Sequence, residues 1–175
     1  MLIQTGNLLV SHPAHSDAES VIIVTDSGRE HTIGIELAVR SEITMAELMQ
    51  QKSVEWPWHT PVYPGGESNR GALVMLHSLD WTSSNTNFIS PELAISSDAL
   101  MLEKLEMGNA PAWHRLFLGC TVFRTKDLRE ELARNRSRWL LLSTPSFATL
   151  ERDSKNIWKS CLNELSSRAT QQYLA

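Results

Sequence analysis

The pattern of apolar and polar positions predicts short strands interleaved with helices. Seven apolar or β-branched runs are bounded by Gly, Pro, Ser or Asp and predict strands at residues 8–10, 21–25, 32–37, 72–76, 93–96, 116–123 and 139–142. The run at 21–25 is apolar at nearly every position, so it predicts a central strand. Gly34, inside the third run, predicts a β-bulge or a close backbone approach.

Four segments carry apolar residues at helical spacing and helix-capping residues. Thr44 and Glu47 form a capping box, Ser97 is expected to cap a helix that ends near Met107 before Gly108, and Thr125 is expected to cap a third. The last helix is expected at 153–168, with an apolar stripe of Ile157, Cys161, Leu162 and Leu165. Strands and helices mix without strict alternation, which favours one α+β domain over residues 1–175.

Turn residues separate these elements. Asp26-Ser27-Gly28 predicts a turn, because Asp and Gly both favour turn conformations. Pro57 and Pro61 exclude regular structure from residues 56–61, and Pro64-Gly65-Gly66 predicts a tight turn before the next strand.

Length and composition indicate an ordinary globular protein. The chain has 175 residues, of which 42% are hydrophobic and 21% charged. It contains no run of about 20 apolar residues that could span a membrane, and no basic residue precedes Arg29, so we expect a cytoplasmic protein without a signal peptide. Cys120 and Cys161 lie in apolar contexts, so we expect buried thiols rather than a disulfide or a metal pair.

Charge is distributed unevenly along the chain. Residues 1–111 have a net charge of −9 and residues 112–175 a net charge of +5, giving −4 in total. The basic excess peaks at Arg124, Lys126, Arg129, Arg134, Arg136 and Arg138. This segment is either a patch for nucleic acid or another anionic partner, or a solvated helix face whose bases pair with Asp127, Glu130 and Glu131. The interspersed acids favour the second interpretation.

Catalytic and metal-binding patterns are weak. His12 and His15 flank Pro13, which excludes the helix that would align them as metal ligands. His114 and Cys120 share a strand, but six residues separate them by about 20 Å. We therefore predict no catalytic residue, no metal site and no cofactor.

Two segments are candidates for ligand contact. Gly65, Gly66, Arg70 and His77 bracket one turn and strand, and with Gly119 they could form a ligand-binding groove. Glycine permits close approach, and Arg and His donate to anions. The alternative is a tight turn between strands. Trp56 and Trp58, beside His59, are either binding anchors or caps on the edge of the core.

An ordered set of short motifs runs through nearly the whole chain. Its members are Gly6 to Pro13, Val21 to Leu37, Tyr63-Pro64-Gly65-Gly66, Leu76-His77, Leu118-Gly119-Cys120, Phe123, Asp127-Leu128, Glu130-Glu131, Asn135 and Trp139-Leu140. In this order the residues resemble the AlgH/YqgE-like family of bacterial proteins. The chain departs from the family pattern at Cys120, Phe123 and Asp127, where the family usually has Tyr, Trp and Gln, so it resembles a divergent member.

The resemblance implies a fold and only a loose function. It implies an α+β domain with a bifurcated, mostly antiparallel sheet curled into a pseudo-barrel and flanked by helices. Members often carry the label of transcriptional regulator, although no helix-turn-helix pattern is present here. We expect a non-enzymatic binding or regulatory protein with a nucleic-acid or protein partner. The alternatives are a small-molecule-binding protein or hydrolase, and a protein-interaction module.

Overall fold

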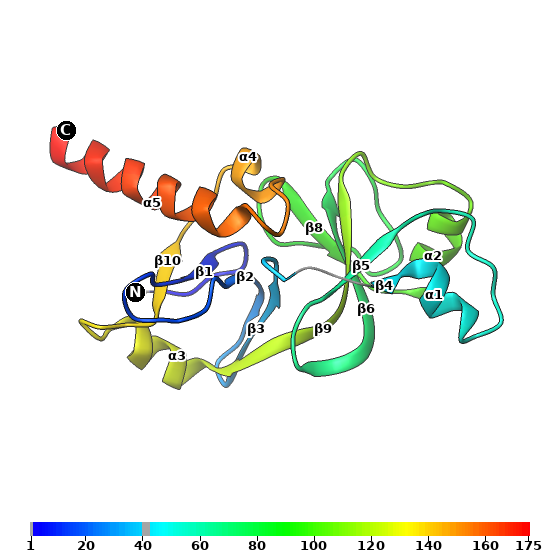
Figure 1. The fold of residues 1–175 in the computed structure, drawn as a ribbon, viewed down its shortest axis with the longest axis horizontal. Helices are drawn as coiled ribbons and strands as arrows, with labels where there is room; N and C mark the ends of the chain where they lie inside the picture. Colours follow the sequence, from blue (N-terminus) through cyan, green and yellow to red (C-terminus); the bar gives the residue numbers. More distant parts are fainter. Residues whose placement is uncertain (1, 40–42) are drawn as a thin grey trace. The chain divides into compact units, whose positions relative to one another are not determined.

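The computed structural model describes residues 2–39 and 43–175 and divides into two compact units (Figure 1). The first unit joins Met1–Val39 to Thr121–Ala175, and the second is Arg40–Cys120. Strand β9 (His114–Arg124) belongs to both, with its last four residues in the first unit. The α+β class and the mostly antiparallel sheet are confirmed. That the chain forms a single domain stays a prediction.

The first unit is built on an antiparallel sheet in the order β10-β1-β2-β3-β9. Its strands are β10 (Trp139–Leu142), β1 (Leu8–Ser11), β2 (Val21–Ser27), β3 (His31–Glu36) and the end of β9. The apolar run at 21–25 is indeed in a central strand, and Val21, Ile23 and Val24 are fully buried.

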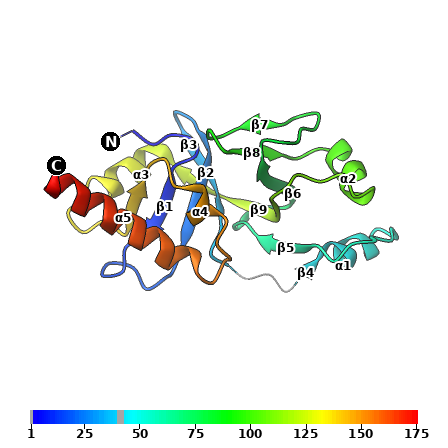
Figure 2. The same ribbon diagram turned by 90° about the horizontal axis from the view of Figure 1, so that it is seen from above.

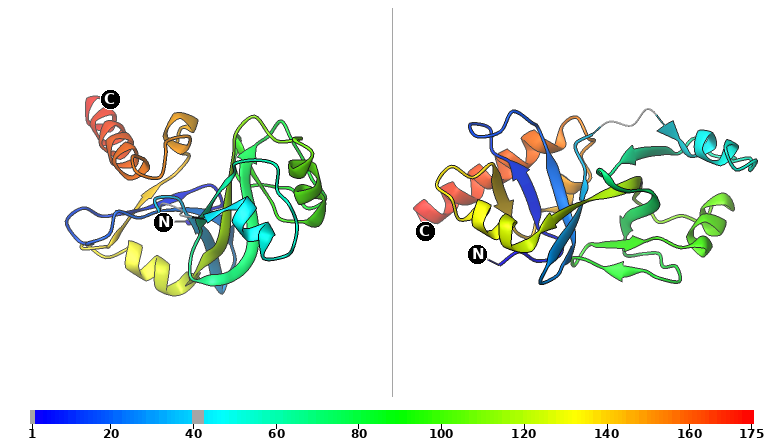
Figure 3. Two further views of the ribbon diagram at one scale, coloured as in Figure 1. Left: turned by 45° about the vertical axis from the view of Figure 1, so that its right-hand side comes forward. Right: turned by 90° about the horizontal axis from the view of Figure 1, so that it is seen from below.

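Helices cover opposite faces of this sheet. Figures 1 and 3 show α3 (Thr125–Leu132) on one face and α5 (Ile157–Leu174) on the other, with the short α4 (Phe147–Leu150) before α5. Leu9 packs in a cluster with Leu128 of α3, while the Trp158 indole on α5 donates to the Ser11 carbonyl at 3.0 Å. Strands covered on both faces need apolar residues at successive positions, which explains their unbroken apolar runs.

The second unit carries a curled sheet in which β9 is paired on both sides (Figure 2). One side of β9 pairs antiparallel with β6 (Ser68–Ser78), followed by β8 (Leu93–Ser96) and β7 (Asn87–Phe88). The other side pairs parallel with β5 (Pro61–Pro64), which pairs with β4 (Ile43–Thr44). Helices α1 (Met45–Gln50) and α2 (Ala99–Glu106) contribute Met45, Met101 and Leu105 to the core.

Gly34 and the first turn illustrate how the sheet bends. Strand β2 continues through Ser27, so the predicted turn at 26–28 is wrong, and the chain reverses at 28–30. A bulge between Val24 and Asp26 lies opposite Gly34 and the residue before it. A Cβ atom at Gly34 would lie 2.8 Å from the Ile23 carbonyl oxygen, so the predicted close approach is confirmed.

The ends of several helices differ from the prediction, in two cases because the expected capping side chain forms no capping hydrogen bond. Asp98, not Ser97, caps α2 by accepting from the Met101 N–H at 2.8 Å. Thr125 is the first residue of α3, and its hydroxyl donates to the Gly28 carbonyl at 2.8 Å instead of capping. Helix α5 begins at Ile157, four residues later than expected, and continues to Leu174.

Proline did not exclude a strand at residue 61. Pro61 begins β5 and Pro64 ends it, which is possible because this short strand lies near the sheet edge. Strand β6 begins at Ser68 rather than at residue 72, and the capping box of α1 is confirmed. Within residues 2–39 and 43–175, no helix is long and apolar enough to cross a membrane. A cytoplasmic location stays a prediction.

Candidate functional site

An aromatic pocket lies in the second unit, between the loop at residues 56–60 and the end of α2. Its volume is about 320 Å³, and most of its surface is apolar. The residues that shape it are Trp56, Trp58, His59, Leu105, Gly108 and His114. Pockets of about 300 Å³ or more with apolar walls and a few polar groups are typical small-molecule sites.

The two loop tryptophans have different environments. Trp56 is 9% exposed, packs in the core cluster with Met45 and Leu105, and its indole N–H donates to the Thr60 hydroxyl at 3.3 Å. Trp58 is 50% exposed, and its indole N–H donates to the Glu106 carbonyl at 3.0 Å. One tryptophan therefore anchors the loop in the core, while the other forms an accessible wall of the pocket.

Gly108 allows the Trp58 ring to approach the end of α2. It has a φ of +78° after the C-terminus of α2, as the sequence predicted for this glycine. A Cβ atom here would lie 3.0 Å from Cζ2 of Trp58. The same glycine thus ends the helix and provides the flat surface on which the indole lies.

His114 supplies a polar group to the pocket wall. Burial lowers the pKa of His114 below its ordinary value of 6.5, and a hydrogen bond to the Pro111 carbonyl opposes that shift. The imidazole is therefore neutral at neutral pH. The nitrogen that faces Pro111 donates, so the other ring nitrogen is an acceptor.

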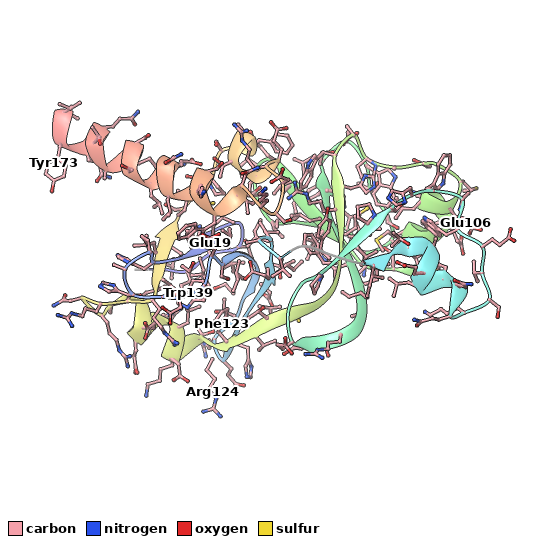
Figure 4. The ribbon with its side chains drawn as sticks, in the orientation of Figure 1. Glu19, Glu106, Phe123, Arg124, Trp139 and Tyr173 are labelled. Atoms are coloured by element: carbon pink, nitrogen blue, oxygen red, sulfur yellow. The ribbon has the colours of Figure 1, made fainter. Side chains whose placement is uncertain are left out.

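An acidic groove lies beside the aromatic pocket and shares Trp56 with it. Its volume is about 640 Å³, and three glutamates line it: Glu47, Glu55 and Glu106. The Glu47 carboxylate accepts from the Thr44 N–H at 2.6 Å in the capping box. Among the described residues, Glu55 and Glu106 form no ion pair. Figure 4 shows Glu106 at the exposed end of α2.

Four of the five residues proposed for the first ligand groove come together. Gly65 donates its N–H to the Leu118 carbonyl at 2.7 Å, and the Gly66 carbonyl oxygen would lie 2.7 Å from a Cβ atom on Gly119. Residues 69–72 form a bulge opposite Gly119, and the exposed Arg70 in it pairs with Glu67. Chain backbone thus fills the space beside Gly119.

His77 is not part of that arrangement. It lies seven residues beyond Arg70 on β6, or about 23 Å along an extended strand, and is fully buried. Its Nδ1 donates to the Ser78 carbonyl at 2.7 Å, so its Nε2 accepts from the Ser96 hydroxyl at 2.8 Å. Burial lowers the pKa of His77, although the hydrogen bond to the Ser78 carbonyl and the charge of Asp80 oppose that shift. The structure therefore does not bring His77 together with the glycines.

The α3 surface, defined as residues 124–138, contains both free and paired bases. Glu131 accepts from the Arg138 backbone N–H at 2.8 Å and from the Arg134 guanidinium at 3.0 Å, and these contacts hold the pKa of Glu131 below its ordinary value. Lys126 lies 3.9 Å from Glu130. A hollow of about 480 Å³ here is lined by three arginines and three acids.

Three bases of the α3 surface have no acidic partner in the described part of the chain: Arg124, Arg129 and Arg136. Figure 4 shows Arg124 pointing away from the ribbon, below Phe123 and Trp139. Those two rings form an edge-to-face pair at 6.2 Å beneath the charges. Three of the six predicted contact residues are thus available to a partner.

The remaining chemical candidates are isolated. Burial raises the pKa of the Cys161 thiol to about 12, which makes it unreactive, and Cys120 is partly buried without a disulfide. His12 and His15 stack at 4.1 Å although Pro13 separates them, because the loop itself turns back there. No group of three metal-ligating side chains occurs within the parts of the chain that the structure describes.

Sequence reasoning missed half of the aromatic pocket. Trp56, Trp58 and His59 were identified as candidate anchors, but Leu105, Gly108 and His114 were not connected to them. These residues lie about 50 positions further along the chain. The sequence shows that Gly108 ends a helix and that His114 follows it, but neither feature indicates contact with the loop at residues 56–60.

The comparisons with known proteins agree on one family. The model of the AlgH-like family matches residues 8–170. A UPF0301 protein of Bacteroides thetaiotaomicron is 26% identical over 174 residues, covering 96% of this chain and 86% of the relative. A UPF0301 protein of Marinomonas is 29% identical over 147 residues, covering 78% of this chain and 75% of the relative.

Solved structures show the same fold. The solution structure of the AlgH protein of Pseudomonas aeruginosa superposes with a TM-score of 0.76 at 20% identity, covering 97% of this chain and 93% of that one. The crystal structure of a protein from Corynebacterium diphtheriae gives 0.68 at 19% identity, with coverage of 90% and 85%. With the family match over residues 8–170, these findings show that the chain belongs to the AlgH-like family, whose function is not established.

Proposed function

We propose that this protein is a non-enzymatic binding protein that takes a small molecule in the aromatic pocket. The main supporting observation is the cavity of about 320 Å³ that is lined by Trp58, Leu105 and His114, among others. Trp58 is held by its hydrogen bond to Glu106, so the wall is formed before a ligand arrives. A preformed wall lowers the entropy that binding would otherwise lose.

The surroundings of the reactive side chains support a binding role over catalysis. The His77–Ser96 pair has the hydrogen bond of a base and nucleophile, but both residues are at most 1% exposed. The Cys161 thiol is buried and protonated. His114, one of the two histidines that line the pocket, has its donor nitrogen directed at a backbone carbonyl rather than at a nucleophile.

The test uses a neutral aromatic probe, 2-phenylethanol, titrated to about 10 mM while the indole N–H signals are followed by NMR. We expect the Trp58 signal to shift in wild type and the binding to disappear in Trp58→Ala. Phe88→Ala is the matched control, because Phe88 is a 64% exposed aromatic residue of the same unit outside the pocket. Failure to bind, or equal binding by Trp58→Ala, would overturn the proposal.

A second candidate function is contact with an anionic partner such as nucleic acid. It is supported by Arg124, Arg129 and Arg136 of the α3 surface, which form no ion pair with any acid that the structure describes. Binding to a fluorescent DNA duplex would be measured at about 50 and 200 mM salt, where several phosphate contacts produce a steep loss of affinity. This assay also tests the label of transcriptional regulator.

The variant for this second test is Arg124→Glu with Arg129→Glu. We expect this variant to bind the DNA duplex about tenfold more weakly than wild type, or weaker still. Lys155→Glu with Lys159→Glu is the charge-matched control, because both lysines are exposed and belong to the same unit but lie outside the α3 surface. If both variants lose the same affinity for the duplex, the change in net charge explains the loss, and the α3 surface is not a specific site.

The third hypothesis, a protein-interaction module, depends on exposed tryptophans. Only Trp58 of the pair is exposed, and it is already bonded to the end of α2. A single fixed ring beside a cavity favours a small ligand over a broad protein contact.

A further inference from the structure

We propose that the ligand of the aromatic pocket is a small organic cation, an amine that carries an aromatic or branched aliphatic group. This inference rests on the proposed function, because it names the chemical class for the same pocket. Four features support it: the shared wall of pocket and groove, the charges of the groove glutamates, the aromatic faces of the pocket tryptophans and the neutral state of His114.

Trp56 lies on a wall that an apolar space and an acidic one share. It lines both the pocket of about 320 Å³ and the groove of about 640 Å³. Trp58 lines the pocket and Glu106 the groove, and the Trp58 indole is bonded to the Glu106 carbonyl, so the two linings are in direct contact. A molecule that is apolar at one end and positively charged at the other matches both spaces.

The glutamates determine the sign of that charge. Glu55 and Glu106 are exposed and form no ion pair within the described part of the chain, while Glu47 is held by the capping box. The sequence of the second unit holds nine Asp and Glu against five Lys and Arg, so its surroundings do not supply the missing cations. An anionic ligand would meet repulsion at the groove, and a cationic one attraction.

Tryptophans of this unit already bind cations where the chain provides them. Lys104 Nζ lies 5.1 Å from the centre of the Trp81 ring, and the Arg115 guanidinium lies 5.4 Å from that of Trp113. Among the described residues, Trp56 and Trp58 have no such partner, although they line the pocket. Aromatic rings beside carboxylates are the usual recognition elements for ammonium groups.

His114 does not oppose a cation in the pocket. Its imidazole is neutral at neutral pH, because burial disfavours the charged form. The ring nitrogen that does not face Pro111 accepts a hydrogen bond, which an ammonium N–H can donate. A protonated histidine at this position would have repelled the ligand, so the buried environment of His114 is a condition for the binding we propose.

The experiment compares three probes with the same aromatic body: 2-phenylethylamine, 2-phenylethanol and 3-phenylpropanoate. Titrations at pH 7.5 and about 20 mM salt would follow the Trp58 indole signal. We expect a dissociation constant on the order of 1 mM or tighter for the amine. The amine is expected to bind about fivefold tighter than the alcohol and the carboxylate more weakly than either.

The glutamates are tested with Glu55→Gln and Glu106→Gln combined. In this variant the amine is expected to lose its advantage, while the affinity for the alcohol stays the same. Glu67→Gln with Glu92→Gln removes the same charge from this unit outside the groove, and it should keep the advantage of the amine.

Each outcome separates this inference from the proposed function. If the alcohol binds but the amine has no advantage, or keeps its advantage without Glu55 and Glu106, the cation proposal is wrong and the pocket remains a binding site. If neither the alcohol nor the amine binds to wild type, both proposals are wrong. Loss of the advantage only in the groove variant supports the cation proposal.

Discussion

The α3 surface and the aromatic pocket differ in how their polar groups are satisfied. On the α3 surface, Glu131 binds both Arg134 and Arg138, so much of the basic segment is neutralised within the chain. Beside the pocket, Glu55 and Glu106 have no ion pair among the described residues, and Trp58 is half exposed. A run of like charges is therefore weaker evidence for a partner than a few groups that the fold leaves without one.

The division into units explains why the charge asymmetry of the sequence is misleading. Residues 112–175 have a net charge of +5, but most of them share a unit with residues 1–39, which hold five acids and one arginine. The first unit consequently carries eleven bases and eleven acids, while the second has a net charge of −4. The acidic unit is the one that contains the pocket.

The largest effect on stability is expected at the two loop tryptophans, because one is an anchor in the core and the other a wall of the pocket. Trp56→Ala should lower the free energy of unfolding by about 3–5 kcal/mol, because it removes a buried ring from the core. Trp58→Ala should change it by about 1 kcal/mol or less and abolish probe binding. Urea denaturation measures the first and NMR titration the second. Equal losses of stability would contradict the division into anchor and wall.

The glycines beside β9, Gly65, Gly66 and Gly119, provide a second test, because chain backbone fills the space there whereas the aromatic pocket is open. Gly119→Ala should destabilise by about 2–3 kcal/mol, because its φ of +76° and the Gly66 carbonyl both exclude a Cβ atom. Gly71→Ala is the control, since no atom lies within 4 Å of the added Cβ. Thermal unfolding compares the two variants. A neutral Gly119→Ala would mean that the space there is available after all.

Acidity should weaken the second unit through the buried His77 and the partly buried His114. Burial lowers the pKa values of His77 and His114 below 6.5 in the folded state, so the unfolded chain binds more protons below that pH. The free energy of unfolding should therefore be constant at pH 7–8 and fall as the pH drops from about 6.5 to 5. Lowered carboxylate pKa values act only at more acidic pH.

His114→Gln should reduce this pH dependence in urea denaturation. His31→Gln, at an exposed histidine of the first unit, is the control and should leave the slope unchanged. If the free energy of unfolding of His114→Gln depends on pH as steeply as that of wild type, groups other than His114 cause the dependence.

The smallest effect is expected on the α3 surface. Glu131→Gln should strengthen duplex binding about threefold, because it releases Arg134 and Arg138 as well as removing a negative charge. Glu130→Gln removes the same charge but only a 3.9 Å contact with Lys126, so its effect should be smaller. Fluorescence anisotropy with the same duplex measures both. Equal effects would show that the internal ion pairs do not limit binding.

Local patterns predicted most of the elements. The seven apolar runs all lie in strands except for Leu37, which follows β3. The capping box, the helix-ending Gly108 and the close approach at Gly34 are also confirmed. These features depend on neighbours within a few residues, for which the sequence is sufficient. The sequence did not predict the short strands β4, β5 and β7, because pairing partners rather than their own residues stabilise them. It also did not predict helix α4, a single turn capped by Ser146.

By itself the sequence determined the class of fold, the family and the pair of tryptophans worth attention, since each of these depends on residue type and order. Only the tertiary structure decided which tryptophan is buried, that His77 belongs to the core, and which arginines and glutamates form ion pairs with one another. The physical reason is that burial and pairing are set by contacts between distant segments, such as residues 56–60 with the end of α2. The order of charged and apolar residues along the chain does not tell which distant segments come into contact.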